Sequence, residues 1–104
     1  MKTESLRHTR LILLGALFLS GANGLGLIYF TRGDYRNALS HFDIAVQHYP
    51  KQAQIRFNRA LALLKLKRPA DARHEAAVIK ELETGSAHVF SAQLQKIMRI
   101  ENEL

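Results

Sequence analysis

The stretch LGLIYFTRGDYRNALSHF, residues 25–42, places small and bulky apolar side chains at helical spacings on both sides of an Arg-Gly-Asp turn. Gly26 and Ala38 lack side-chain bulk, so each marks a point where two helices can cross closely. Gly33 permits a tight turn, and Asp34 can cap the helix that follows it. The stretch therefore predicts two antiparallel helices joined by a short turn.

The apolar surface that such a crossing would bury comes from positions around the same turn, namely Leu25, Tyr29, Phe42 and Ala45. Pro50 follows the second helix and would end it. From Ala22 to Pro50 the pattern resembles the tetratricopeptide repeat, which pairs two antiparallel helices over about 34 residues. That repeat has Leu-Gly-x-x-Tyr in its first helix, Ala-x-x-x-Phe in its second helix and a closing proline.

A second copy of the pattern follows, shifted by 34 residues. Its packing positions stay small or apolar: Ala60, Leu63, Ala72 and Ala76 stand where the first copy has Gly26, Tyr29, Ala38 and Phe42. Other positions depart from the pattern, with Arg59, Lys67, Pro69 and Thr84 in place of Leu25, Gly33, Tyr35 and Pro50. Pro69 still suits the first turn of a helix. The second hairpin is therefore a degenerate repeat.

The last part of the chain predicts one more helix over residues 86–104. Gly85 is a natural helix stop, and Ser86 is a natural cap. One face of this helix is apolar, made of Phe90, Leu94, Ile97, Met98 and Leu104. The predicted fold is all-α, with two hairpins over residues 20–84 and a C-terminal capping helix. Two repeats are fewer than the three or so that an independent array needs, which favours a homodimer or docking on a partner.

The amino terminus is typical of a bacterial export signal. Residues 1–10 are polar and net basic, residues 11–19 are all apolar, and residues 20–22 are small, as a signal peptidase site requires. Two alternatives stay open: a signal cleaved near Ala22, or an uncleaved anchor over residues 11–24 that continues into the first repeat helix. We expect the uncleaved anchor, with the repeats on the periplasmic side of the inner membrane; cleavage would give a soluble periplasmic protein.

Charge and cysteine content limit the function classes. The formal net charge is +6, and the basic residues after the amino terminus are interleaved with acidic and apolar positions. This distribution favours solvated helix faces over a nucleic-acid surface, because no row of aromatic residues is present to stack on bases. The absence of cysteine excludes a thiol nucleophile and a thiolate metal site. A basic adaptor for nucleic acid stays open as the least favoured alternative.

No pattern in the chain predicts catalysis, a cofactor or a metal site. His74-Glu75-Ala76-Ala77-Val78 begins like the zinc motif His-Glu-x-x-His, but Val78 replaces the second histidine. His41 and His48 share a helix face without a third ligand. The glycines at 21, 24 and 26 follow no predicted strand, so they do not form a phosphate loop.

The resemblance to tetratricopeptide repeats implies a binding function, in which the first helix of each unit lines a groove for a partner's peptide or helix. On the second unit one helix face carries Gln54, Phe57, Asn58, Leu61 and Lys65, which form the candidate contact surface. In the alternative interpretation, Phe57 and Leu61 pack on neighbouring helices. We expect a membrane-anchored or exported scaffold, an accessory subunit of an envelope complex. A soluble periplasmic peptide-binding or chaperone-like protein is the alternative.

Overall fold

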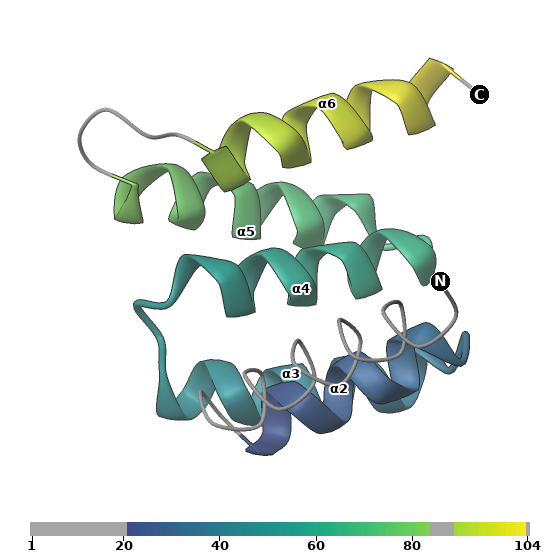
Figure 1. The fold of residues 1–104 in the computed structure, drawn as a ribbon. Helices are drawn as coiled ribbons and strands as arrows, with labels where there is room; N and C mark the ends of the chain where they lie inside the picture. The colour runs from purple at the N-terminus through teal and green to yellow at the C-terminus, as the bar shows by residue number, and fades with distance from the viewer. Residues whose placement is uncertain (1–20, 84–88, 104) are drawn as a thin grey trace, which may run out of the picture.

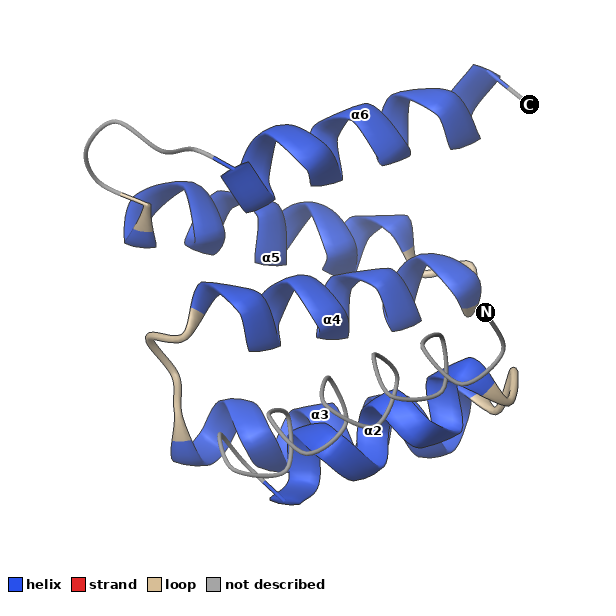
Figure 2. Ribbon diagram, viewed as in Figure 1, coloured by secondary structure: helices blue, strands red, loops and turns tan. Residues whose placement is uncertain are grey.

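The computed structural model describes residues 21–83 and 89–103, which form five α-helices and no strand. They are α2 (Gly21–Thr31), α3 (Tyr35–His48), α4 (Ala53–Lys65), α5 (Pro69–Leu82) and α6 (Val89–Glu103). Consecutive helices run in opposite directions and stack in one direction, from the α2–α3 pair to α6 (Figure 1). Figure 2 shows that each helix from α2 to α4 is joined to the next one by a short connection. The all-α prediction is confirmed.

The predicted export signal and the turn before the last helix lie largely outside the described residues. Residues 1–20 belong to the former, and Gly85 and Ser86 to the latter. Residues 21–24, the end of the expected anchor, are the first turn of α2. None of the helices within residues 21–83 and 89–103 is long and apolar enough to cross a bilayer.

The first hairpin, α2 with α3, follows the sequence pattern closely. Gly33 has a φ of 78°, the left-handed conformation that a glycine adopts without steric cost. The side chain of Asp34 caps α3, since its Oδ1 accepts a hydrogen bond from the backbone N–H of Asn37 at 3.3 Å. Gly26 lies directly against the ring of Phe42, which leaves no space for a larger residue. The predicted turn and cap of this hairpin are both present.

The second hairpin, α4 with α5, repeats this geometry with different residues. Lys67 occupies the position of Gly33 and adopts the same left-handed conformation, with a φ of 61°. Pro69 begins α5, where its missing N–H leaves no helical hydrogen bond unmade. The second turn therefore has the geometry of the first although its sequence differs.

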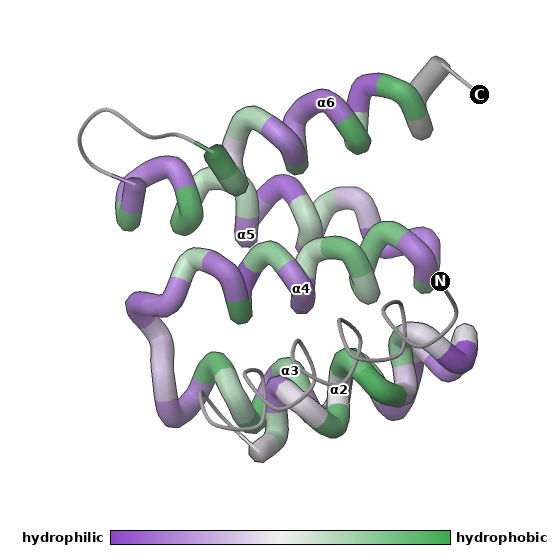
Figure 3. The backbone as a smooth tube through the Cα atoms, viewed as in Figure 1, coloured by the Kyte–Doolittle hydropathy of each residue, from purple (hydrophilic) through white to green (hydrophobic). Residues whose placement is uncertain are grey.

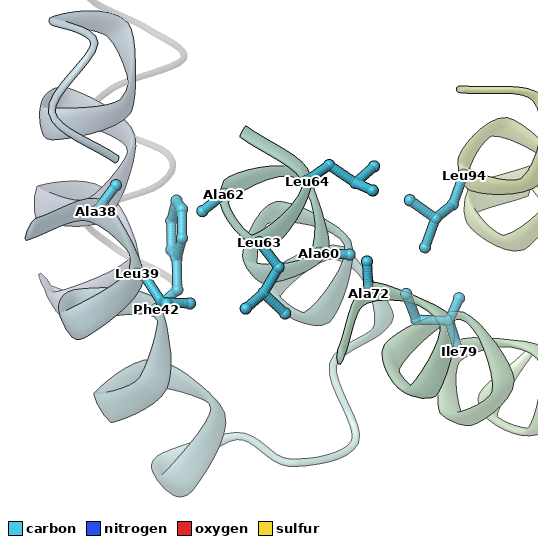
Figure 4. Close-up of a cluster of buried hydrophobic side chains, with 10 residues drawn as sticks. All are labelled: Ala38, Leu39, Phe42, Ala60, Ala62, Leu63, Leu64, Ala72, Ile79 and Leu94. Carbon is cyan, nitrogen blue, oxygen red and sulfur yellow. The ribbon is translucent and has the colours of Figure 1, made fainter. Parts of the chain in front are cut away.

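All five described helices contribute residues to one apolar core. Its buried centre is drawn in Figure 4 and consists of Ala38, Leu39, Phe42, Ala60, Ala62, Leu63, Leu64, Ala72, Ile79 and Leu94. Ala45 is also buried, while Tyr29 and Ala76 pack against the core from its edge. In Figure 3 hydrophobic and hydrophilic residues alternate along α3 to α6, as expected of helices with one face inward.

Leu25 differs from the expectation that it packs in the hairpin crossing. Its side chain is 43% exposed. The next residue, Gly26, faces Phe42, and successive residues of a helix point about 100° apart, so Leu25 is turned away from the crossing. Three helix turns of apolar sequence did not by themselves show which side of α2 faces α3.

Candidate protein-interaction surfaces

The five residues predicted as a contact surface on α4 do not form one exposed face. Gln54 and Lys65, near the two ends of the helix, are exposed. Asn58 is only 8% exposed, and its side-chain nitrogen donates to Oδ1 of Asn23 in α2 at 3.1 Å. This pair of buried amides joins the first helices of the two hairpins, so Asn58 is a structural contact between repeats.

The two apolar residues of that surface also contact neighbouring helices. The ring of Phe57 lies against the ring of Phe90 in α6, with centroids 5.4 Å apart. Leu61 lines a narrow cavity of about 60 Å³, together with Leu27, Phe30 and Phe42. These contacts match the alternative interpretation of Phe57 and Leu61, in which both pack within the fold.

A buried ionic network, which we did not predict from the sequence, joins three helices. Glu75 of α5 is 1% exposed and accepts from two arginines of α4, Arg56 and Arg59. The Arg56 Nη1 to Glu75 Oε2 distance is 3.1 Å. Arg59 also donates through Nε to Oδ1 of Asp43 in α3, at 2.6 Å. The network therefore couples the second helix of the first hairpin to both helices of the second.

Electrostatic interactions favour the charged form of Arg59. Burial alone lowers the pKa of Arg59, but its hydrogen bond with Asp43 and the charges of Glu75 and Asp43 outweigh that effect and raise the pKa above its ordinary value. Both carboxylate oxygens of Glu75 are engaged by guanidinium groups. Glu75, part of the sequence that resembles a zinc motif, thus balances two partly buried cations.

The sequence did carry a signal for this network. Arg59 stands where the first repeat has an apolar leucine, and Glu75 lies one turn from Ala72 and Ile79, both core positions. Opposite charges at inward positions of two paired helices indicate a buried ion pair, because neither charge would be stable there alone.

An open groove separates α5 from α6 on the outer end of the stack. Its volume is about 630 Å³. From α5 it is lined by Arg73, Ala76, Ala77 and Lys80. From α6 it is lined by Gln95, Met98 and Arg99. The floor is therefore apolar, and three cations stand around it.

The start of α6 is held by a residue outside that helix. Oε1 of Glu83 accepts hydrogen bonds from the backbone N–H groups of Phe90 and Ser91, at 2.9 and 3.1 Å. These amides lie in the first turn of α6, where no helical acceptor is available and where a negative charge is favourable. Glu83 thus fixes the helix that forms one wall of the groove.

These features define a small helical-hairpin repeat protein whose exposed surfaces are suited to docking. A family model described as tetratricopeptide repeat matches residues 23–81, more than half of the chain. The chain therefore belongs to the tetratricopeptide repeat family, whose repeats generally mediate interactions between proteins. Comparison with curated proteins and with solved structures gave no match.

Proposed function

We propose that this protein is a non-catalytic interaction module held at a membrane, where it serves as an accessory or assembly subunit of a larger complex. The observation that carries the proposal is the match to the tetratricopeptide repeat over both hairpins, residues 23–81. The exposed residues Gln54 and Lys65 and the α5–α6 groove supply surface on which another protein can dock.

The membrane part of the proposal is supported by the sequence of residues 1–24, with its basic start and apolar run. An uncleaved anchor would place the repeats on the periplasmic side of a bacterial inner membrane. Cleavage near Ala22 would instead release the module, and Asn23 would still be present for its contact with Asn58. Intact mass of the native protein separates these outcomes, and extraction at alkaline pH leaves only an anchored form in the membrane pellet.

The binding part is tested by site-specific cross-linking in the native membrane. A photo-cross-linking residue is placed at Gln54 on α4 or at Ala77 in the groove, both exposed, with Ser40 on α3 as the matched exposed control. We expect one reproducible adduct with another protein from Gln54 or Ala77 and none from Ser40. Equal adducts from all three positions, or adducts with copies of this chain alone, would contradict the proposal.

A further inference from the structure

The α5–α6 groove is open because two of its positions carry smaller or more polar residues than the positions 34 residues earlier, which lie on α3 and α4. Ala76 stands 34 residues after Phe42, and Gln95 stands 34 residues after Leu61. Phe42 and Leu61 together close a cavity of about 60 Å³, whereas Ala76 and Gln95 line a groove of about 630 Å³. The space beside this pair of positions is therefore narrow in one repeat and wide in the next.

One residue of α6 that lines the groove, Met98, corresponds to a residue that packs on the following helix in the first repeat. Met98 corresponds, two repeats on, to Phe30 of α2. Phe30 packs on the second helix of its own hairpin, where its ring meets that of Tyr35 edge-on with centroids 5.1 Å apart. Met98 packs against the edge of the core, and α6 contacts only α4 and α5 among the described helices, so none of them covers Met98 from the other side. The groove is therefore shaped to accept a helix.

The charges around the groove select the kind of helix. Arg73, Lys80 and Arg99 line it with no carboxylate among its lining residues, and none of the three makes an ion pair with a side chain of residues 21–83 or 89–100. By contrast, the arginines between the two hairpins are paired with Glu75 and Asp43. Unpaired cations around an apolar floor complement a ligand that is apolar in the middle and acidic at its edges.

We propose that this groove binds an acidic amphipathic helix of a partner protein. Its apolar face would cover Ala76, Ala77 and Met98, and its carboxylates would meet Arg73, Lys80 and Arg99. Arg73 and Lys80 lie seven residues apart on α5, or about 10 Å, so carboxylates two helical turns apart match them. This inference rests on the proposed interaction function, because it names the chemistry of the partner.

Two other occupants fit less well. A second copy of the chain would bring its own net charge of +6 toward three cations. A nucleic acid would supply phosphates for the cations, but none of the described residues that line the groove is aromatic and could stack on bases. Both occupants are distinguishable outcomes of the test below.

The test measures binding of the full chain, in a non-ionic detergent, to a designed helical peptide of 14 residues, the length of α5. The peptide has leucine and alanine on one face and glutamate two turns apart on each edge; its control has lysine in place of every glutamate. We expect the acidic peptide to bind at least about tenfold more tightly than the control, with affinity that falls as salt is added.

Variants locate the binding. R73E/R99E reverses two cations of the groove, and R36E/K51E makes the same change of four charge units at exposed positions that do not line it. The first variant should weaken binding at least about tenfold, and the second should leave it unchanged. Ala77→Phe keeps every charge but adds bulk at an exposed position of the groove, so it should block the peptide without lowering the melting temperature.

Equal binding of both peptides would overturn the inference, as would unchanged binding by R73E/R99E with an unchanged circular dichroism spectrum. Competition by polynucleotide but not by the acidic peptide would assign the groove to nucleic acid, and a dimer that R73E/R99E disrupts would assign it to a second copy. The two proposals can fail separately. If the chain does not bind the acidic peptide, but Gln54 still cross-links to another protein in R73E/R99E, this inference is wrong and the proposed interaction function stands.

Discussion

Gly26 and Phe42 depend on each other at the crossing of α2 and α3. A methyl group on Gly26 would lie 2.5 Å from both Cδ1 and Cε1 of Phe42, whose ring is completely buried. We predict that Gly26→Ala lowers the free energy of unfolding. Overpacking costs about 1–3 kcal/mol, and the better helix propensity of alanine returns about 1 kcal/mol at most. Urea unfolding followed by circular dichroism measures the difference.

A double-mutant cycle identifies the cause of that loss. In a Phe42→Leu background the ring is absent, so Gly26→Ala should cost clearly less than it does in the natural protein. Equal costs in both backgrounds would show that the destabilisation comes from somewhere other than the contact between these two residues.

Lys67 holds a backbone conformation that its side chain disfavours. Its φ of 61° matches that of Gly33 in the equivalent turn, and the left-handed region costs a residue with a Cβ about 1–2 kcal/mol. We predict that Lys67→Gly stabilises the protein by up to about 1 kcal/mol, since part of the gain is lost to the greater freedom of glycine in the unfolded chain. Thermal unfolding would show a higher melting temperature.

A matched change within a helix supplies the control for Lys67. Lys80 is an exposed residue inside α5, and Lys80→Gly should destabilise by about 1 kcal/mol through lost helix propensity. If both substitutions were destabilising to the same extent, the conformation of Lys67 would not be costly.

At the scale of single helices, α6 begins where Glu83 accepts two of its first amide hydrogens. We predict that Glu83→Ala destabilises by about 0.5–2 kcal/mol, as the loss of an N-terminal cap does. The effect should be local: amide hydrogen exchange should rise in the first turns of α6, while α2 and α3 stay protected. Glu81, an exposed residue of the last turn of α5, provides the control in Glu81→Ala. Equal exchange in both variants would contradict a capping role.

The helices of this protein could be predicted from the sequence where the residues that determine them lie within the same hairpin. The αL glycine at 33, the cap at Asp34 and the 34-residue recurrence of small residues all act within one hairpin, and the two hairpins follow from them. The cap of α6 was not predictable in the same way. Its acceptor, Glu83, precedes the connection to α6, and the cap that the sequence pattern predicted, Ser86, lies outside the described residues.

The predicted contact surface on α4 is partly covered by other helices, for a related reason. Helical spacing placed Phe57, Asn58 and Leu61 on one face of α4, but it could not show how many other helices that face meets. Here α4 packs against each of the other four described helices. Residues of this face therefore contact Asn23 and Phe90 and line the cavity beside Phe42. The open groove lies between α5 and α6 instead.

For the molecule as a whole, the connection between the two hairpins depends on a buried carboxylate. Glu75→Gln leaves Arg56 and Arg59 without the charge they face, and breaking a buried ion pair costs about 3–5 kcal/mol. We predict a loss near the lower end, because both arginines retain some contact with solvent. Asp71→Asn breaks an exposed pair with Arg68 and should cost about 1 kcal/mol or less. Similar losses in the two variants, measured by urea unfolding, would contradict a buried role for Glu75.

The position of the tyrosines allows the coupling of the two hairpins to be measured directly. All three tyrosines, Tyr29, Tyr35 and Tyr49, lie in or just after the first hairpin, and the chain has no tryptophan. Tyrosine fluorescence therefore reports the first hairpin, whereas far-ultraviolet circular dichroism reports every helix. In a repeat protein each unit is stabilised through its interface with the next, and here that interface contains Asn58, Arg59 and Leu61.

We predict that the two signals give coincident urea transitions in the natural protein, since neither hairpin buries enough surface alone. Arg59→Ala removes the residue that contacts both Asp43 and Glu75, so it should lower both midpoints and can separate them. Lys51→Ala, in the exposed α3–α4 connection, should leave the transitions coincident and unshifted. Separate transitions in the natural protein would mean that the hairpins unfold independently, and that the buried contacts between them contribute little to stability.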